Sequence, residues 1–475
     1  MSRVVLSESE HVPTPDQFVT FVPYACNRLC APFKVRIKSQ IQEDYVSRHD
    51  AKTGAKKSKG ALTHVAHSQR EVHVSTSKVE AAGGSMSVSV QEDDDNCDVY
   101  TLYAMTDVAH HLTELSVAPC QEIPLFLMKV LSLCIPYNIY LNKLIMKCTL
   151  TSPAFYETIV LLTTSHITEL YLDDSRLCEH NYDILLDYQT HLQLLSLARC
   201  SLTDDDCALL FSKLEYPNPA SKNLNTLILS SNFISNIGAG HIANTLRSNR
   251  ALMYLNLSGN RIRDAGAMEI FRTLMEFPIT SEEIMQKRRR TIYHLKLRKE
   301  VYQKCYKQLM STPVLDMSED RSSKRRNTQP GILRRRQSMS MAGTDFMSAS
   351  VAAVRAEKMT AELVAENIDP FSVESTIIRD NILYSKGNMV LSYLNLSYNY
   401  VGYESVVKLI EVMKYQALVG TYPELGLVGL QLDGNELPRC REVEALSALL
   451  AHALQVRLMY AVPQTGRRVD KSKKK

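Results

Sequence analysis

The sequence predicts an α/β solenoid, in which short strands and helices alternate along the chain and stack as repeated units. Three observations predict this fold class. A pattern of leucines recurs six times, the spacing of apolar residues changes from strand-like to helical within each copy, and the pattern returns after a long basic segment. Because the copies share one form, we expect their strands to be neighbours in one parallel sheet.

The recurring pattern has the form L-x-x-L-x-L-x-x-(N/C)-x-L, where x is any residue. In the copy that begins at Leu252, the later positions are Leu255, Leu257, Asn260 and Ile262. Other copies begin at Ile167, Leu192, Leu224, Leu391 and Leu427, and a degraded copy lies near Tyr140. A single match occurs by chance, but six matches in order predict an array of repeats.

Each copy predicts one strand followed by one helix. Alternate residues of the Leu-x-Leu segment point inward, and the Asn or Cys after it can bond backbone groups where the strand turns away. The next segment, DAGAMEIFRTL at 264–274, places its apolar residues on one face of a helix. We expect Asp264 to be the N-cap of this helix. A single strand and helix cannot bury their apolar faces alone, so the units must stack.

These motifs, and NRIRDAGAMEIFRTL above all, resemble leucine-rich repeats of the ribonuclease-inhibitor type over residues 140–278 and 389–457. The resemblance implies a leucine-rich repeat solenoid with a curved parallel sheet inside and helices outside. It implies no particular function, because this fold hosts many.

Composition divides the rest of the chain into four regions, of which three lie near the ends. We expect residues 1–98 to be partly disordered, because residues 47–87 are rich in Gly, Ser and Lys. We expect a helical N-terminal cap over 99–139, which would cover the open end of the first repeat block. A basic tail occupies residues 458–475.

The fourth region, residues 279–388, is a long basic insertion between the two repeat blocks. Residues 281–340 contain 16 Lys or Arg against 6 Asp or Glu, a balance of +10, whereas the whole chain carries +4. We expect a long helix over 282–309, a disordered segment after it, and a second helix from Val351.

Cysteine usage and the N-terminus bear on the compartment. The 11 Cys residues are odd in number without a repeated spacing, and the N-terminus lacks the apolar segment of a secretory signal. The most apolar window, 123–141, contains Lys129 and two prolines and is too short to span a bilayer. We therefore expect a soluble cytoplasmic protein with free thiols and no membrane contact. The cytoskeleton and the cilium are candidate locations.

Motifs of common enzyme classes are absent from the sequence, including the P-loop, G-x-S-x-G, H-E-x-x-H and the kinase set. We therefore predict a non-enzyme without a cofactor. His64, His67 and His73 lie in a low-complexity stretch, and Cys26 and Cys30 have no second cysteine pair. Neither group predicts a metal site.

The exposed positions of the predicted strands form the candidate binding surface. Tyrosine is frequent there and charge is rare, which favours protein contact because Tyr brings a large area at a small entropy cost. The predicted protein-binding residues are Glu169, Tyr171, Ser196, Thr226, Ile228, Tyr254, Asn256, Tyr393, Asn395 and Gln431, with Leu194 and Gly429 beside them. The alternative is a solvated concave face with the partner bound elsewhere.

Two short basic sequences in the insertion resemble acceptor sites of basophilic kinases and predict phosphorylation at Thr328 and Ser338. Each phosphate would add about −1.5 to −2 charge to a basic segment and so change its partners. An import signal and a plain linker are the alternatives. The segment also fits an acidic surface such as tubulin. Nucleic acid is not expected, because no aromatic residue interleaves the basic residues of 324–336.

Two functions fit these observations. The first is a non-catalytic scaffold or adaptor for protein–protein interaction, and repeats broken by a basic insertion resemble leucine-rich repeat proteins of motile cilia. The second is GTPase activation, because the Ran GTPase activator has similar repeats with a catalytic Arg near their start, where this chain offers Arg176 and Arg199. That activator has an acidic tail, whereas this chain ends in a basic one. Ribonuclease inhibition ranks lower, because Glu169 is the only acidic residue among the candidate positions.

Overall fold

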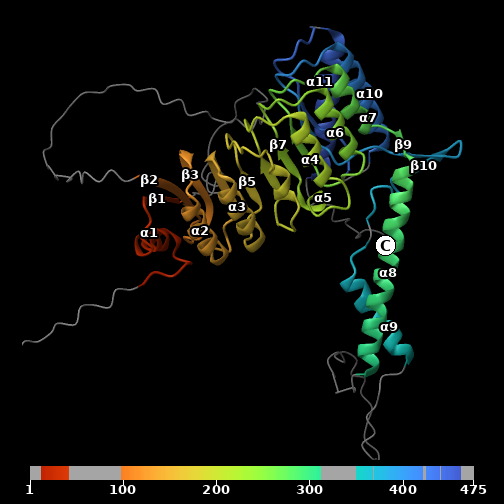
Figure 1. The fold of residues 1–475 in the computed structure, drawn as a ribbon. Coiled ribbons are helices and arrows are strands. Elements are labelled where there is room, and N and C mark those ends of the chain that lie inside the picture. Colours follow the sequence, from red (N-terminus) through yellow and green to blue (C-terminus); the bar gives the residue numbers. More distant parts are fainter. Residues whose placement is uncertain are drawn as a thin grey trace, which may run out of the picture. The chain divides into compact units, whose positions relative to one another are not determined.

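The computed structural model describes residues 12–41, 98–311, 349–366, 368–420, 424–438 and 440–461 (Figure 1). Most of the expected disorder, at 47–87 and between the two insertion helices, lies outside these residues, as do nearly all of the basic tail and both predicted phosphorylation sites. The described residues confirm a mixed α/β fold with a long sheet of ten strands, in the order β1-β2-β3-β4-β5-β6-β7-β8-β12-β13. The chain divides into two compact units, the first made of residues 1–206, 223–233 and 256–259 and the second of the remainder.

The first unit opens with a segment that differs from the sequence prediction. Its elements are α1 (Phe18–Arg28), β1 (Lys34–Ile41), β2 (Val99–Thr106), β3 (Leu112–Glu122), α2 (Leu125–Cys134), a 3-10 turn (Ile135–Tyr137) and β4 (Lys143–Thr149). The predicted helical cap over 99–139 is therefore wrong in its first half, because two strands occupy it. Both strands bury alternate apolar residues such as Leu102, Ala104, Leu115 and Val117, a period of two that belongs to a strand.

Repeated units follow in the same unit. They comprise α3 (Ser152–Thr164), β5 (Glu169–Tyr171), a 3-10 segment (Tyr182–Leu186), β6 (Leu194–Ser196) and β7 (Thr226–Ile228). Strands β3 to β7 pair in parallel, whereas β2 and β3 are antiparallel. The central leucines of the short strands, Leu170, Leu195 and Leu227, are fully buried, as the repeat pattern predicts.

The second unit continues the repeats on both sides of the insertion. Its elements are most of α4 (Asp204–Lys213), α5 (Ala220–Asn223) and β8 (Tyr254–Asn256), and all of α6 (Asn236–Leu246), α7 (Asp264–Thr273), β12 (Tyr393–Asn395), α10 (Tyr403–Val419), β13 (Gly429–Gln431) and α11 (Arg441–Ala461). Leu394 pairs with Leu430 in parallel register, and helix α7 packs on both α6 and α10. The repeat after the insertion therefore stacks directly on the repeat before it.

Asp264 does not cap its own helix, which corrects the sequence prediction. Helix α7 begins at Asp264 with Arg263 as N-cap, and the Asp264 carboxylate accepts from Gly402 N at 2.8 Å and from Ser405 N at 3.3 Å. The start of α10 is therefore capped from the preceding repeat. Asn236 does the same for α7, because its Oδ1 accepts from Arg263 N at 2.8 Å. A cap from one repeat to the next fixes their stacking as well as the helix start.

The insertion is folded at its base. It comprises β9 (Phe277–Pro278), α8 (Ser281–Ser311), α9 (Ala349–Leu363), β10 (Thr376–Arg379) and β11 (Ile382–Ser385), and both predicted helices are confirmed. Helices α8 and α9 pack side by side, and the three strands form a small antiparallel sheet that the sequence did not predict (Figure 1). The chain returns to the repeats at Gly387, where φ is +89° and a Cβ would lie 2.5 Å from Met275 O. Only glycine fits that return point.

No helix in the described residues is long and apolar enough to cross a membrane.

Candidate protein-binding surface

An asparagine after each of the strands β7, β8, β12 and β13 fixes the turn of the backbone. The Oδ1 atom of that Asn accepts the amide of the residue that follows the same turn one repeat earlier. These contacts are Leu202 N to Asn232 at 3.1 Å, Ile234 N to Asn260 at 3.1 Å, Ile262 N to Asn399 at 3.1 Å and Val401 N to Asn435 at 3.0 Å. The Ile262 contact spans the insertion with the same geometry as the others. Cys200 occupies the slot with a weaker donor, and its Sγ donates to Leu172 O at 3.2 Å.

Each short strand has two outward positions, one on either side of its central leucine, and the fixed turns hold the side chains at these positions. We call the outward positions of β5 to β7 the early strip and those of β8, β12 and β13 the late strip. The early strip is Glu169, Tyr171, Leu194, Ser196, Thr226 and Ile228, and the late strip is Tyr254, Asn256, Tyr393, Asn395, Gly429 and Gln431. All predicted binding residues lie at these positions, and their binding role remains a prediction.

In the early strip, the polar groups already contact one another. Lys143, on the neighbouring strand β4, forms an ion pair with Glu114 at 2.9 Å, and its Nζ lies 5.2 Å from the centre of the Tyr171 ring. The Tyr171 hydroxyl donates to Glu169 at 3.4 Å. Burial and the Glu169 carboxylate raise the pKa of Tyr171 to about 12. A partner would have to break these contacts before it could use the groups.

Ser196 corrects the prediction of an accessible residue. Its side chain is only 1% exposed, and its hydroxyl donates to the Asp173 carboxylate at 2.5 Å. Asp173 accepts the only hydrogen-bond donor of the Ser196 side chain. Ser196 is therefore part of the strand support rather than of the contact surface.

The late strip presents uncharged aromatic and amide groups. The Tyr254 and Tyr393 rings lie 6.1 Å apart at 35°, and Tyr393 is 39% exposed. A Cβ on Gly429 would lie 2.2 Å from Cδ1 of Tyr393, so this glycine makes the room in which the ring lies. Burial raises the pKa of Tyr254.

Two amides beside these rings can donate to a partner. Oδ1 of Asn256 accepts from Ser258 N at 3.0 Å, and Oδ1 of Asn395 accepts from Ser397 N at 2.9 Å. Each oxygen is held by the next turn of the chain, and within the described residues neither Nδ2 has a hydrogen-bond acceptor. The late strip therefore combines amide donors with two tyrosine rings, and tyrosine is one of the residue types enriched in binding hot spots.

A residue with positive φ marks the turn after each of the short strands β5, β6, β7, β8, β12 and β13, and we call these residues the rim. These residues are Asp174, Arg199, Ser231, Gly259, Tyr398 and Gly434, all with positive φ. Arg199 donates to Asp174 twice, at 2.6 and 2.7 Å. Tyr398 is 67% exposed, and a Cβ on Gly434 would lie 2.3 Å from its ring. The tyrosines of the second repeat block thus lie over glycines of the final repeat in both the late strip and the rim.

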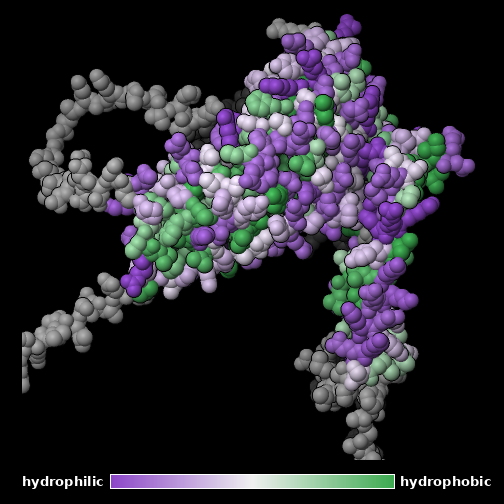
Figure 2. All heavy atoms as spheres, in the orientation of Figure 1, coloured by the Kyte–Doolittle hydropathy of each residue, from purple (hydrophilic) through white to green (hydrophobic). Residues whose placement is uncertain are grey.

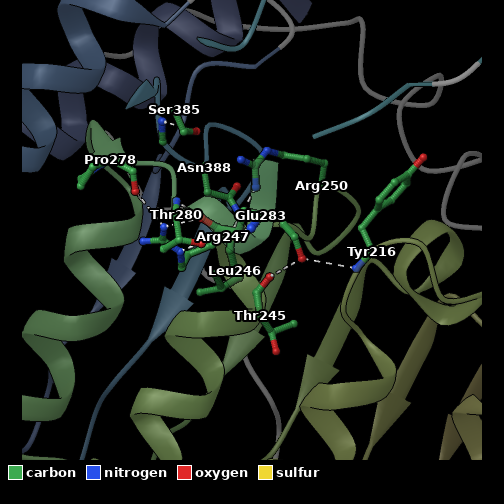
Figure 3. A network of polar contacts seen from close by, with 12 residues as sticks. Tyr216, Thr245, Leu246, Arg247, Arg250, Pro278, Thr280, Glu283, Ser385 and Asn388 are labelled. Carbon is green, nitrogen blue, oxygen red and sulfur yellow. Dashed lines mark hydrogen bonds and ion pairs between the residues drawn. The ribbon is translucent and has the colours of Figure 1, made fainter. Parts of the chain in front are cut away.

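Arg247 fastens the start of the insertion to helix α6 (Figure 3). Its guanidinium donates to both oxygens of Glu283 at 2.8 Å and to Pro278 O at 2.9 Å, and it lies 4.2 Å from the centre of the Phe277 ring. Burial opposes ionisation of Glu283, but the bonds from Arg247 and Thr280 outweigh it and hold the pKa of Glu283 below its ordinary value.

The end of the insertion meets the same loop after α6 (Figure 3). Asn388 Nδ2 donates to Leu246 O and Asn249 O, both at 3.0 Å. Arg250 donates to the same two carbonyls from Nη1, whereas its Nη2 is buried and has no hydrogen-bond acceptor in the described residues. Burial lowers the pKa of Arg250 to about 10.

A second guanidinium joins helix α8 to the segment that follows α9. Arg290 on α8 donates to both oxygens of Asp369 at 2.8 and 3.3 Å, and it lies 5.2 Å from the centre of the Tyr216 ring. The Arg290 and Asp369 side chains are only 14% and 5% exposed. Phe371, two residues on, packs with Phe277 and Ile279 in a small apolar cluster. The insertion is thus a fixed element at its base.

Beyond this base, α8 presents a dense row of cations. We call α8 and α9 together the basic hairpin. Six exposed Lys or Arg residues have no ion pair in the described part of the chain: Arg288, Arg289, Lys296, Lys299, Lys304 and Lys307. Exposed apolar residues such as Ile292 and Leu295 lie among them. Figure 2 shows hydrophilic and hydrophobic side chains interspersed along the hairpin.

The structure describes only some of the residues considered for metal binding and neither of the predicted phosphorylation sites. Across the described ranges, no cluster of three or more His, Cys, Asp or Glu side chains could hold a metal ion. Cys26 is buried and Cys30 is exposed, while His64, His67 and His73 lie outside the described residues. Thr328 and Ser338 also lie outside them, so their phosphorylation stays a prediction.

One protein family matches the chain. The leucine-rich repeat family model matches residues 248–271, which include the repeat that begins at Leu252. No curated protein matches the chain. The match supports a leucine-rich repeat protein, and it indicates a role in protein–protein interaction, since this family typically provides non-enzymatic interaction domains.

Proposed function

We propose that this protein is a non-catalytic scaffold that binds a protein partner on the late strip. The observation that carries the proposal is the pair of neighbouring rings, Tyr254 and Tyr393, with the Asn395 amide two residues beyond Tyr393 on the same strand. The early strip supports the same choice of surface, because its Glu169 and Tyr171 already contact each other and Lys143 lies over the Tyr171 ring. Tyrosine at the centre of a contact surface supplies area with few rotatable bonds.

Site-specific photo-crosslinking tests this proposal. A benzophenone amino acid at position 395 should link one discrete partner in cells, whereas the same probe at Ile237 on α6 should not. Ile237 is a fair control because it is 67% exposed and lies on a helix of the same unit. Equal crosslinking at both positions, or crosslinking only at 237, would contradict a partner on the late strip.

We further propose that the basic hairpin is a second contact site, for an acidic protein surface such as tubulin. Six exposed cations along α8 support it, because charges of one sign attract an opposite surface over about a Debye length, roughly 8 Å at physiological salt. Co-sedimentation with microtubules tests it. Binding should weaken with added salt and after proteolytic removal of the acidic tubulin tails. Binding that neither treatment changes would contradict the proposed contact site.

A cytoskeletal or axonemal location is the finer form of this proposal. The layout of repeats and basic insertion is similar to that of leucine-rich repeat-containing protein 71, which is associated with motile cilia. Proximity labelling in ciliated and non-ciliated cells tests the location. Enrichment of axonemal proteins in ciliated cells supports it, whereas enrichment of nuclear import components supports an import role for the insertion.

The alternative function is GTPase activation in the manner of the Ran GTPase activator. Such activity needs an arginine that is free to reach the nucleotide. Arg199 is held by Asp174 in a two-bond ion pair, and Arg176 is exposed. Hydrolysis of GTP by small GTPases, measured with the wild type and Arg176→Ala, tests this alternative. A stimulated rate that Arg176→Ala abolishes would favour it over a scaffold.

A further inference from the structure

Two cysteines face each other across neighbouring strands of the first unit. Cys120 on β3 is the register partner of Cys148 on β4. The pairing of the two strands is irregular just before this pair. Val117 pairs with Met146, so β3 advances three residues to Cys120 while β4 advances two to Cys148. One extra residue on β3 therefore makes a β-bulge, next to Pro119, which cannot donate to the ladder.

The bulge decides where the Cys120 side chain points. Leu115 and Val117 point into the core, so an unbroken alternation would send residue 119 inward and residue 120 outward. The extra residue reverses this phase and brings Cys120 to the face on which Cys148 is buried. Cys120 remains partly exposed, whereas Cys148 is 3% exposed. One thiol of the pair is thus open to small reagents and the other lies behind it.

The two thiols also shift each other's pKa values. A hydrogen bond with Cys148 lowers the pKa of Cys120 against the opposing effect of burial. The same hydrogen bond, together with burial, raises the pKa of Cys148. The exposed member is therefore the better nucleophile, because the thiolate rather than the thiol reacts with oxidants. The buried member stays protonated and is placed to react second.

We infer that Cys120 and Cys148 form a dithiol modification site at which a hydroperoxide oxidises the pair to a cross-strand disulfide. Neighbouring strands lie about 4.7–4.9 Å apart, and disulfides join residues whose Cα atoms are about 4.4–6.8 Å apart, so partners on adjacent strands are within reach of each other. The exposed thiol at the bulge receives the oxidant and the buried thiol resolves it. This site is independent of both proposed protein contacts.

The chemistry balances in two steps. The Cys120 thiolate attacks one oxygen of hydrogen peroxide, the O–O bond breaks, and Cys120 becomes a sulfenic acid while hydroxide leaves. The Cys148 sulfur then attacks the sulfenic sulfur, the S–S bond forms, and the Cys148 proton and the sulfenic hydroxyl leave as water. Overall, two thiols lose two electrons and two protons, and the peroxide is reduced to two waters.

Other cysteines of the chain provide matched comparisons. Cys178 and Cys30 are exposed, so peroxide reaches them equally well. Cys26 and Cys134 are close enough to interact electrostatically, but both are buried. We expect the first two to stop at single-thiol oxidation and the second two to stay reduced in the folded protein.

Peptide mapping of the full chain tests the inference. The reduced protein is treated with hydrogen peroxide, unfolded, alkylated, digested and analysed by mass spectrometry without reductant. We expect one linked peptide that joins Cys120 to Cys148, which dithiothreitol separates, and a matched loss of alkylation at both sites. Cys178→Ser should leave this product unchanged, while Cys148→Ser should leave a Cys120 sulfenic acid that dimedone traps.

Two results would overturn the inference. One is oxidation of Cys178 and Cys30 while Cys120 remains alkylatable. The other is a Cys120 that oxidises but links to a different cysteine. Both results are read from the wild-type chain, so they do not depend on whether a variant folds.

Discussion

Apart from Asn256, the late strip belongs to the same unit as the basic hairpin, and the two surfaces are built in opposite ways. The strip holds uncharged rings and amides on strands whose turns repeat one asparagine contact. The hairpin carries six exposed cations on one helix that is held at its base by two guanidinium groups. A partner on the strip would be held by short-range contact, whereas charge would attract a partner to the hairpin. Added salt should therefore weaken binding to the hairpin more than binding to the strip.

The largest effect is expected from a variant that loosens the basic hairpin and leaves the late strip intact. Arg290→Ala leaves the buried Asp369 carboxylate without its ion pair, which should destabilise the base of the hairpin by about 3–5 kcal/mol. Hydrogen exchange should quicken at the amide of Phe371 and along α8, and should stay unchanged at Ile262 in the strip's support. Arg298→Ala is the control, because the exposed Arg298–Glu357 pair contributes only about 0–1 kcal/mol. Equal exchange in both variants would show that Arg290 is no anchor.

Removal of the rings tests the strip itself. The double variant Tyr254→Ala/Tyr393→Ala should weaken binding of the crosslinked partner by about 2–4 kcal/mol, because central tyrosines carry much of the energy of a contact. Calorimetry at low and high salt should give nearly the same loss. Tyr156→Ala, on α3, removes a similarly exposed tyrosine and should change little. A loss that disappears at high salt would assign the partner to charge instead.

A single added methyl should move a ring without removing it. Gly429→Ala places a Cβ 2.2 Å from Cδ1 of Tyr393, so the ring must shift, and we expect about 1–3 kcal/mol of combined loss in stability and affinity. Denaturant unfolding and calorimetry separate the two contributions. Gly240→Ala is the matched control, since nothing lies within 4 Å of its added Cβ. Its position inside α6 predicts a gain of roughly 0.5–1 kcal/mol.

The smallest effect per residue is expected on the hairpin. Neutralising Lys296, Lys299 and Lys304 together with glutamine should lower affinity for microtubules by less than about 1 kcal/mol per residue, because exposed charges are strongly screened. The association rate and its salt dependence should fall more clearly than the dissociation rate rises. Lys408→Gln, on α10, is the control. An unchanged salt dependence would remove the hairpin from the binding model.

Much of the repeat architecture could be predicted from the sequence, because the residues that repeat are the ones that are buried. Leu255 and Leu394 lie on adjacent central positions of one sheet, as the pattern requires. The asparagine slot was also predictable, since a side chain with both donor and acceptor suits a turning strand. Local spacing thus suffices where one contact recurs in every repeat.

Contacts that occur once could not be predicted in this way. Asp264 meets α10 across 138 residues of chain, and Arg290 meets Asp369 across 79. Nothing in the local spacing identifies such partners. The strands at 99–122 were missed because the repeat pattern is absent there, and Ser196 was judged accessible because alternation alone does not reveal what covers a small side chain.

The chain leaves the repeats and re-enters them at nearly one place. Ile279 N donates to Leu383 O at 2.9 Å, and Asn388 N donates to Thr273 O at 2.8 Å. A segment whose ends meet can be exchanged as a cassette, because a short link would close the same gap without altering the order of the strands. Evolution could therefore replace the hairpin, and with it the partner that the hairpin binds, while the strip is retained. A protein engineer could do the same.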